Sequence, residues 1–439
     1  MTHELRPEER LLVLLSYSRP TTEEDGEART LAPDWDTLWT LARENATEPL
    51  VHSNLERLGL PVPEPIRTRF RERAERIREV NEARLRIARE VFARFANRRI
   101  PVVILKGVLF GETIYRNPSY KKMNDVDILI RKEDLDTIYS IYEEMGFFCA
   151  AELFGDSPRK QEKLSHHAPP FFSRDLKFMV GTHWGLITPL APYRLDYDAI
   201  WSRVREIDFY GLPAKSMAPE DNLHHLCVHL PYYKTGVREL ADIYNLVRDV
   251  SIPWDLFLRE VEKAGSENLV SHALSLANRL SPNRQMADAL ARIEPRVSRY
   301  YRRDIARKTE SVSRLLRSRC VHMSVIEKAF TDLNSSRRPR EKWEAFIRMW
   351  RNILLAPDDA VVRMNSVDRP GLWSRSQTPF RIFRVFIRDL GRGVFFLLVL
   401  KSILEVIRAP FQSNGRAGGL AAREGIPIEA LEQLKAALE

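Results

Sequence analysis

The sequence predicts an α+β fold in which a small mixed sheet lies between two helical regions. Apolar residues recur at helical spacing before residue 99 and after residue 195, whereas the segment between them contains short β-branched runs separated by turns. The 439 residues include 44% hydrophobic and 29% charged side chains, which is typical of a globular chain long enough for two or three domains.

Residues 1–98 form the first predicted helical region. Leucines between Leu11 and Leu15 begin an apolar face, and Trp35 and Trp39 continue one. A long, highly charged helix is predicted from Pro65 to Arg99, because its apolar residues recur with a period near 3.6. Its many arginines are expected to cover a face in solvent.

Residues 99–195 contain the predicted sheet. A first strand over 101–105 ends at Lys106 and Gly107, where a short helix follows at 108–115. The remaining predicted elements are strands at 125–131, 146–152, 168–174 and 177–184 and a helix at 133–145. This order of elements indicates one α/β unit with a mixed sheet.

Helical spacing returns in residues 196–355, with helices predicted near 196–205, 219–232, 235–250, 254–280, 285–320, 323–333 and 338–355. Residues 356–411 form a basic and apolar C-terminal segment, within which 364–380 is predicted to be a loop. The apolar run 394–400 is too short to predict a spanning helix, and a buried terminal helix is favoured over an interfacial anchor. Residues 412–439 are expected to be a flexible linker and a short last helix.

Charge is concentrated in one part of the chain. The net charge is +9, and residues 281–350 hold 17 lysines and arginines against 8 acids. Such a segment fits nucleic acid, a membrane surface of anionic lipid or an acidic partner, but few aromatics are interleaved with its arginines, so solvated helices are the favoured interpretation.

The N-terminal segment and the cysteines both indicate the compartment in which the protein is located. The N-terminal segment carries acids where a signal peptide is basic, and the three cysteines are far apart, which favours a reducing cytoplasm. A peripheral position at the inner membrane face is the alternative.

The pattern most informative about function is Asp125-Val126-Asp127, followed by an apolar run. On a strand, residues i and i+2 share a face, so the two carboxylates are expected to lie side by side. Two like charges this close need a counter-ion, and Mg²⁺ prefers oxygen ligands that it shares with substrate phosphates. The sequence therefore predicts phosphate chemistry at the start of this strand.

Several ordered motifs resemble the uncharacterised nucleotidyltransferase family of bacteria, within the polymerase-β-type nucleotidyltransferase superfamily. The resemblance covers roughly residues 30–280. Its motifs are Leu105-Lys106-Gly107, Tyr115, Met123 to Ile130, Glu143 with Met145-Gly146-Phe147, Ser165-His166-His167, Thr182-His183-Trp184, His225 to Leu230 and Gly236 to Ile243.

The resemblance implies transfer of a nucleoside monophosphate, or another phosphoryl group, from a nucleoside triphosphate to a hydroxyl acceptor. In this mechanism Asp125 and Asp127 hold two Mg²⁺ (or Mn²⁺) ions, and Gly107 lets backbone N–H groups approach the phosphates. Lys106 is a candidate positive charge on the β- and γ-phosphates, with a surface lysine as the equal alternative.

The chain departs from the family pattern at two positions. Lys121 stands where the family has an arginine, which keeps the charge but loses the planar fork. Gly181 stands where a third metal-binding carboxylate is expected, two residues before His183. His183 shares a strand face with Gly181 and is a candidate substitute, one that suits Mn²⁺ better than Mg²⁺. Three further candidates for the missing carboxylate are Asp175, Asp196 and Asp198.

Other histidines allow two interpretations each. His167, next to His166, is a candidate contact to the nucleotide or acceptor, or part of a satisfied pair at a strand edge. For His224, His225 and His229, packing with one histidine near the cleft is favoured over a metal cluster. Asp242 either faces the cleft or pairs with Arg238 on its own helix.

The sequence thus favours a metal-dependent nucleotidyltransferase with an unidentified hydroxyl acceptor. Two rival hypotheses remain. One is a degenerate nucleotidyltransferase-like protein that binds without turnover, for which Gly181 is the reason. The other is a basic helical module for nucleic acid or membrane.

Overall fold

The computed structural model describes residues 5–149, 165–175, 177–187, 191, 193–230, 236–310, 312–317 and 369–390, with isolated positions between 347 and 365. These residues fall into two compact units, of which the first takes in almost all of 5–317 and the second the positions from 347 onwards.

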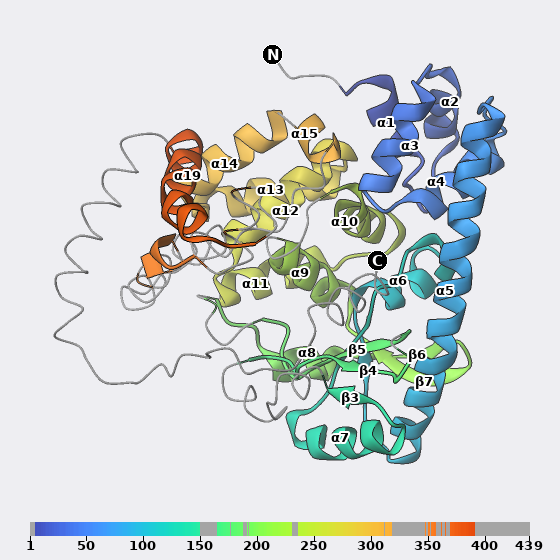
Figure 1. Cartoon of the computed structure of the whole chain (residues 1–439), viewed down its shortest axis with the longest axis vertical. Coiled ribbons are helices and arrows are strands. Elements are labelled where there is room, and N and C mark those ends of the chain that lie inside the picture. The colour runs from blue at the N-terminus through green and yellow to red at the C-terminus, as the bar shows by residue number, and fades with distance from the viewer. Residues whose placement is uncertain are drawn as a thin grey trace. The chain divides into compact units, whose positions relative to one another are not determined.

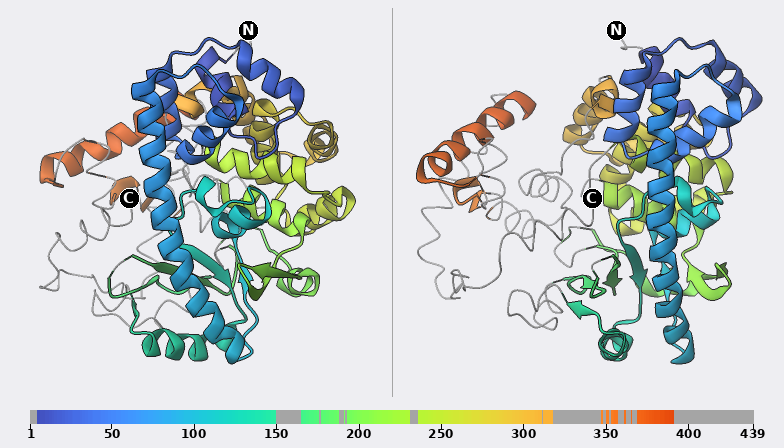
Figure 2. Two further views of the ribbon diagram at one scale, coloured as in Figure 1. Left: turned by 90° about the vertical axis from the view of Figure 1, so that its right-hand side faces the viewer. Right: turned by 45° about the vertical axis from the view of Figure 1, so that its right-hand side comes forward.

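Helices form the N-terminal part of the first unit, as predicted. They are α1 (Pro7–Leu14), α2 (Thr22–Thr30), α3 (Trp35–Glu44), α4 (Glu48–Leu58) and α5 (Glu64–Asn97). The two views of Figure 2 show α5 running from the N-terminal helices to the sheet. Its buried apolar residues, Phe70 and Phe92 among them, follow one helical stripe that belongs to the main hydrophobic core.

The sheet is mixed and contains seven strands within the described residues. They are β1 (Val103–Ile104), β2 (Val126–Leu129), β3 (Phe148–Cys149), β4 (Phe171–Phe172), β5 (Met179–His183), β6 (Arg205–Phe209) and β7 (Leu212–Ser216), in the spatial order β3-β4-β5-β2-β1-β7-β6. Strand β2 lies at the centre, antiparallel to β1 and parallel to β5.

The two faces of the sheet have different neighbours, because alternate residues of a strand point to opposite sides. Val126 and Ile128 of β2 belong to the main hydrophobic core, whose other members include residues of α5 and α7 (Leu135–Glu144). Leu129 belongs to a second cluster with Val103 and with Ile200 of α8 (Tyr197–Arg203). Asp127 alternates with the residues of the main core and therefore shares the face of Leu129.

Further helices complete the first unit, and those from α9 onward pack mainly on one another (Figure 1). These are α6 (Lys106–Thr113), α9 (Pro219–His229), α10 (Val237–Asp249), α11 (Trp254–Ala264), α12 (Glu267–Leu280), α13 (Arg284–Ile293), α14 (Arg299–Glu310) and α15 (Val312–Arg317). The prediction of an α+β fold with helical flanks is confirmed.

Residues 196–355 were predicted to be a helical region, with no element between the helices at 196–205 and 219–232, and this prediction missed two strands. Strands β6 and β7 form a hairpin there, which extends the sheet beyond residue 195. Tyr210 and Gly211 connect the strands with positive φ values of 50° and 83°, as a tight two-residue hairpin turn requires. The Tyr-Gly pair between alternating residues was the available signal.

Three other helix boundaries differ from prediction. Gly265, with φ 72°, ends α11 and divides the single helix predicted over 254–280. A 3₁₀ turn (Glu294–Arg296) that contains Pro295 divides the helix predicted over 285–320. The second unit contains α19 (Leu372–Leu390), so the loop predicted over 364–380 is a helix from residue 372. The apolar run 394–400 and residues 412–439 lie outside the described residues.

Helix α5 fixes the segment that leads into β2. The side chain of Asn81 is fully buried, and its Nδ2 donates to the carbonyls of Pro118 and Lys121, each at 2.8 Å. Its Oδ1 accepts the backbone N–H of Met123 at 3.1 Å. Buried Arg84 donates to the carbonyls of Met123 and Lys177. The arginines of this helix were expected in solvent, and Arg84 is an exception with a positional role.

We expect Asn81→Ala to lower the free energy of unfolding by about 3 kcal/mol, because it leaves two buried carbonyls and one N–H without their partner. Urea unfolding followed by circular dichroism measures this change. Glu82→Ala, at an exposed position on the same helix, is the control and should change stability little. Equal stability of the two variants would contradict the positional role of Asn81.

Candidate functional site

The site is built where β1, β2 and β5 lie side by side. Asp127 of β2 pairs in register with Gly181 of β5, and the backbone N–H of Leu105, at the end of β1, donates to the carbonyl of Asp127 at 3.0 Å. The next residue, Lys106, begins α6. The sheet therefore brings Lys106, Asp127 and the β5 residues Gly181 and His183 together, although they are far apart in the sequence.

Asp127 is the centre of this group. Lys106 Nζ lies 3.4 Å from Asp127 Oδ2, and His183 Nε2 lies 3.2 Å from Asp127 Oδ1. All three side chains are between 12% and 15% exposed. Burial alone raises the pKa of Asp127, but the Lys106 charge and the His183 hydrogen bond outweigh it and hold the pKa below its usual range. Asp127 is therefore ionised at neutral pH.

Asp125 behaves in the opposite way. It lies just before β2, where burial and then the negative charge of Asp127 raise its pKa to about 7. The two carboxylates are therefore close enough to repel each other. In the absence of a cation, Asp125 is therefore the carboxyl group of the pair that keeps a proton more readily.

Both the backbone and the side chain of Lys106 are constrained. Its backbone is in the left-handed region, with φ 43°, which is uncommon for a residue other than glycine and marks local strain. Its Nζ lies 2.6 Å from Nε2 of His229, on α9. Because an ammonium only donates, His229 accepts through Nε2 and is neutral, and burial and the Lys106 charge lower its pKa. His225, one turn earlier, has its ring 5.1 Å from that of His229.

Gly181 has no side chain, and the carboxylate of Asp127 occupies the space where a Cβ of residue 181 would lie. A Cβ at residue 181 would lie only 2.2 Å from Asp127 Oδ1 and 3.2 Å from His183 Nε2. No side chain fits at this position while Asp127 bonds to His183. The absence of a side chain at residue 181 thus allows the position of Asp127, whose carboxylate contacts His183.

Two further histidines lie beside His183. The ring of His167 is 5.1 Å from that of His183, and the ring of His166 is 5.8 Å away. Nδ1 of His167 donates to the carbonyl of Ala168 at 2.8 Å, which leaves Nε2 as an acceptor. Burial lowers the pKa of His167, so the ring is neutral at pH 7. The pair His167–His183 forms an isolated bridge between backbone segments, in agreement with a strand edge.

The comparison with known families agrees with this group of residues. A family model described as uncharacterised nucleotidyltransferase matches residues 32–282, which is more than half of the chain. The chain belongs to this family. Membership supports nucleotidyl transfer as the general class of activity. Searches of curated proteins and of solved structures found no significant match.

Two other predicted site residues, Lys121 and Gly107, lie next to each other. Lys121 is buried and forms an ion pair with Asp242 of α10, and Asp242 also accepts from the Tyr115 hydroxyl at 2.9 Å. Gly107, the second residue of α6, lies over this pair, since a Cβ there would be 3.7 Å from Cε of Lys121. Burial lowers the pKa of Lys121 although Asp242 opposes the change. Asp242 thus pairs with Lys121, whereas the alternative expected from the sequence was Arg238.

The three candidate replacements for the missing carboxylate are engaged elsewhere. Asp175 accepts from Ser173 Oγ at 2.7 Å, and Asp196 caps α8 and pairs with Lys263. The side chain of Asp198 is 97% exposed beside Arg131. Within the described part of the chain, no three side chains of the types His, Cys, Asp and Glu are grouped closely enough to hold a metal by themselves.

Sequence reasoning missed several residues that shape the site. One of His224, His225 and His229 was expected near the cleft, but the contact of His229 with Lys106 was not predicted, because the two residues are 123 positions apart. His224 instead bonds to Ser266 Oγ at 2.7 Å, as a packing residue does. Asn81 and Arg84 carried a weak signal, since both fall on the apolar stripe of α5.

We expect the two aspartates to affect stability in opposite directions. Asp125→Asn should raise the free energy of unfolding of the metal-free protein by about 2 kcal/mol at pH 8. Asp125 has a raised pKa, so its ionisation weakens the fold as pH rises from about 4 to 7, and the gain should therefore nearly vanish at pH 4. Asp127→Asn should lower stability at pH 8, because Lys106 and His183 lose their partner.

Urea unfolding in the presence of a chelator, at pH 4 and pH 8, measures both effects. Asp198→Asn, at the exposed position, is the control and should be neutral. A stabilising Asp127→Asn, or an Asp125→Asn effect independent of pH, would contradict the assigned protonation states.

Proposed function

We propose that this protein transfers a nucleoside monophosphate, or a related phosphoryl group, from a nucleoside triphosphate to a hydroxyl acceptor with the help of a divalent metal. The observation that carries the proposal is the carboxylate pair Asp125 and Asp127 beside Lys106, in a chain of the nucleotidyltransferase family. The pair would bind the cation, and the lysine would meet the phosphates.

The donor set of the site suits such a metal. Mg²⁺ is commonly bound by one or two carboxylates and completes its coordination with substrate phosphates and water, so a closed cage of protein ligands is unnecessary. Asp125 and Asp127 would hold the ion. His183 adds a nitrogen donor, for which Mn²⁺ is a better match. The bound ion supplies positive charge at the transferred phosphate and at the acceptor hydroxyl.

The chain's own residues would orient and neutralise the substrate. Lys106 Nζ, positioned by His229, would attract the β- and γ-phosphates, and the backbone N–H groups at Gly107 and the start of α6 face the same anion. Nε2 of neutral His167 would accept a hydrogen bond from the nucleotide or from the acceptor hydroxyl. Lys121 is paired with Asp242, so we assign it the positioning of α6 and of the segment before Asp125.

A second function is favoured by one observation. Lys106 already supplies a positive charge to Asp127, and Gly181 removes a third carboxylate, so the site is partly neutralised without a metal. A nucleotidyltransferase-like protein that binds nucleotide or a partner without turnover would have such a site. The two functions differ in whether the cation is needed for nucleotide binding.

Calorimetric titration of ATP, GTP, CTP and UTP, with Mg²⁺ or Mn²⁺, tests the proposal without knowledge of the acceptor. We expect one nucleotide to bind with micromolar affinity only when the metal is present. Asp127→Asn should weaken that binding at least tenfold, because the cation loses one of its two carboxylates.

Asp198→Asn serves as the matched control and should bind like the wild type. Metal-independent binding that survives Asp127→Asn would favour the non-catalytic function. If no nucleotide binds under any condition, the nucleotide assignment itself is wrong.

Two substitutions at Gly181 distinguish the effect of side-chain volume from the effect of an added carboxylate. Gly181→Ala should force Asp127 away from His183, because the new Cβ overlaps Asp127 Oδ1. Gly181→Glu should do the same and add a carboxylate, so we expect it to bind Mg²⁺ about tenfold more tightly than Gly181→Ala, a gain near 1.4 kcal/mol.

Competition between Mg²⁺ and Mn²⁺, read from the paramagnetic relaxation of water by Mn²⁺, measures this difference. Equal Mg²⁺ affinity of the alanine and glutamate variants would show that residue 181 does not face the cation site.

A further inference from the structure

Helix α19, in the second unit, buries a side that consists of Ser374, Thr378 and Ile382, and leaves several larger apolar side chains exposed. Ser374 and Thr378 are 7% and 0% exposed, whereas Leu372, Trp373 and Phe380 are 91%, 76% and 71% exposed. A helix that packs on a globular core normally shows the reverse arrangement. The exposed apolar side therefore needs an explanation outside the core.

Hydrogen bonds fix this rotation of the helix. Nδ2 of Asn365 donates to Thr378 Oγ1 at 2.7 Å and to the carbonyl of Ser374 at 3.1 Å. At the start of the helix, Ser374 Oγ accepts the backbone N–H of Gly371 at 2.8 Å. Turning the aromatic side inward would break these bonds, so the outward position of the large side chains is built into the local structure.

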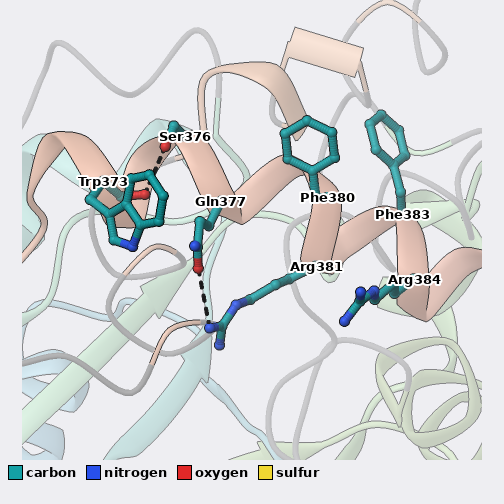
Figure 3. Close-up of a pocket in the computed structure, with 7 residues that line it drawn as sticks. All are labelled: Trp373, Ser376, Gln377, Phe380, Arg381, Phe383 and Arg384. Atoms are coloured by element: carbon teal, nitrogen blue, oxygen red, sulfur yellow. Dashed lines mark hydrogen bonds between the residues drawn. The ribbon is translucent and has the colours of Figure 1, made fainter.

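The exposed side combines aromatic rings with arginines. Figure 3 shows Phe380 and Phe383 projecting to one side of the helix and Arg381 and Arg384 projecting to the other, with Trp373 nearer the start of the helix. These five residues, with Ser376 and Gln377, line one hollow along the helix. Gln377 Oε1 accepts from Arg381 at 3.4 Å, which holds that guanidinium along the helix.

Charge in this segment has a single sign. Between Asp368 and Asp389 the sequence contains five arginines and no acid. A helix with aromatic and aliphatic side chains on one side and arginines at its border matches the boundary between lipid headgroups and acyl chains, where the rings enter the hydrocarbon and the guanidinium groups meet phosphates.

We propose that α19 docks on an anionic lipid bilayer, lying in its surface. Trp373, Phe380 and Leu372 enter the outer part of the hydrocarbon region, and Arg381 and Arg384 pair with lipid phosphates. Nucleic acid fits the arginines but leaves an aliphatic leucine and the edge of the hydrophobic side in water, so lipid is the better match. Within the described residues, no helix has the length and apolar character needed to cross a bilayer.

Flotation of the full-length protein with vesicles tests the proposal. The probes are vesicles of phosphatidylcholine alone and of phosphatidylcholine mixed with phosphatidylglycerol. We expect binding to the mixed vesicles to exceed binding to the neutral ones at least tenfold and to weaken with added salt. Trp373→Ser with Phe380→Ser should reduce that binding at least tenfold, and Arg381→Gln with Arg384→Gln should weaken its salt dependence.

Val80→Ser, at a partly exposed apolar position on α5, is the matched control and should bind vesicles like the wild type. Lipids brominated on the acyl chains give a readout that misfolding does not mimic, because they should quench the fluorescence that is lost in Trp373→Phe and leave the remainder unchanged. Equal binding to both vesicle types, unquenched Trp373, or retention of RNA that depends on Trp373 would each overturn the proposal.

Discussion

The buried charge of Asp127 is the constraint on which the site depends. An ionised carboxylate with little access to water must be paired, and the fold supplies Lys106 from the end of β1 and His183 from β5. The central position of β2 makes this possible, because its two neighbours in the sheet each contribute one partner. Gly181 is part of the same arrangement, since any larger residue would occupy the volume of the Asp127 carboxylate.

Two helices from opposite ends of the family region hold the segment that precedes this strand. Asn81 and Arg84 of α5 bind its backbone carbonyls, and Asp242 of α10 neutralises Lys121 within it. Removal of either charge of a buried pair leaves the other uncompensated, so both helices are tied energetically to the same few residues. The N-terminal helices and the later helices thus act as a frame for a short stretch of irregular chain.

Much of the fold could be predicted from sequence, because hydrophobic periodicity and turn residues are local signals. The Asp125–Asp127 pattern, the strands on either side of it and the long helix α5 all follow from such signals. The hairpin at 205–216 was missed because its alternation is short and mostly polar. The Lys106–His229 contact, the Lys121–Asp242 pair and the overlap at Gly181 depend on tertiary packing, which a single sequence does not encode locally. Helix α19 was mistaken for a loop because Pro379 and small polar residues interrupt its pattern, and two of these polar residues, Ser374 and Thr378, are buried on its inner side.

The contact between Lys106 and Asp127 has a consequence for the order of events at the site. The Lys106 ammonium already provides a positive charge to the Asp127 carboxylate. A metal ion that binds without nucleotide would therefore compete with this ammonium. A triphosphate offers that ammonium a different anion. If the site binds metal and nucleotide as proposed, the nucleotide would free Asp127 for the metal, and the metal would free Lys106 for the nucleotide. Each ligand would then strengthen the binding of the other by the same factor, as linkage requires.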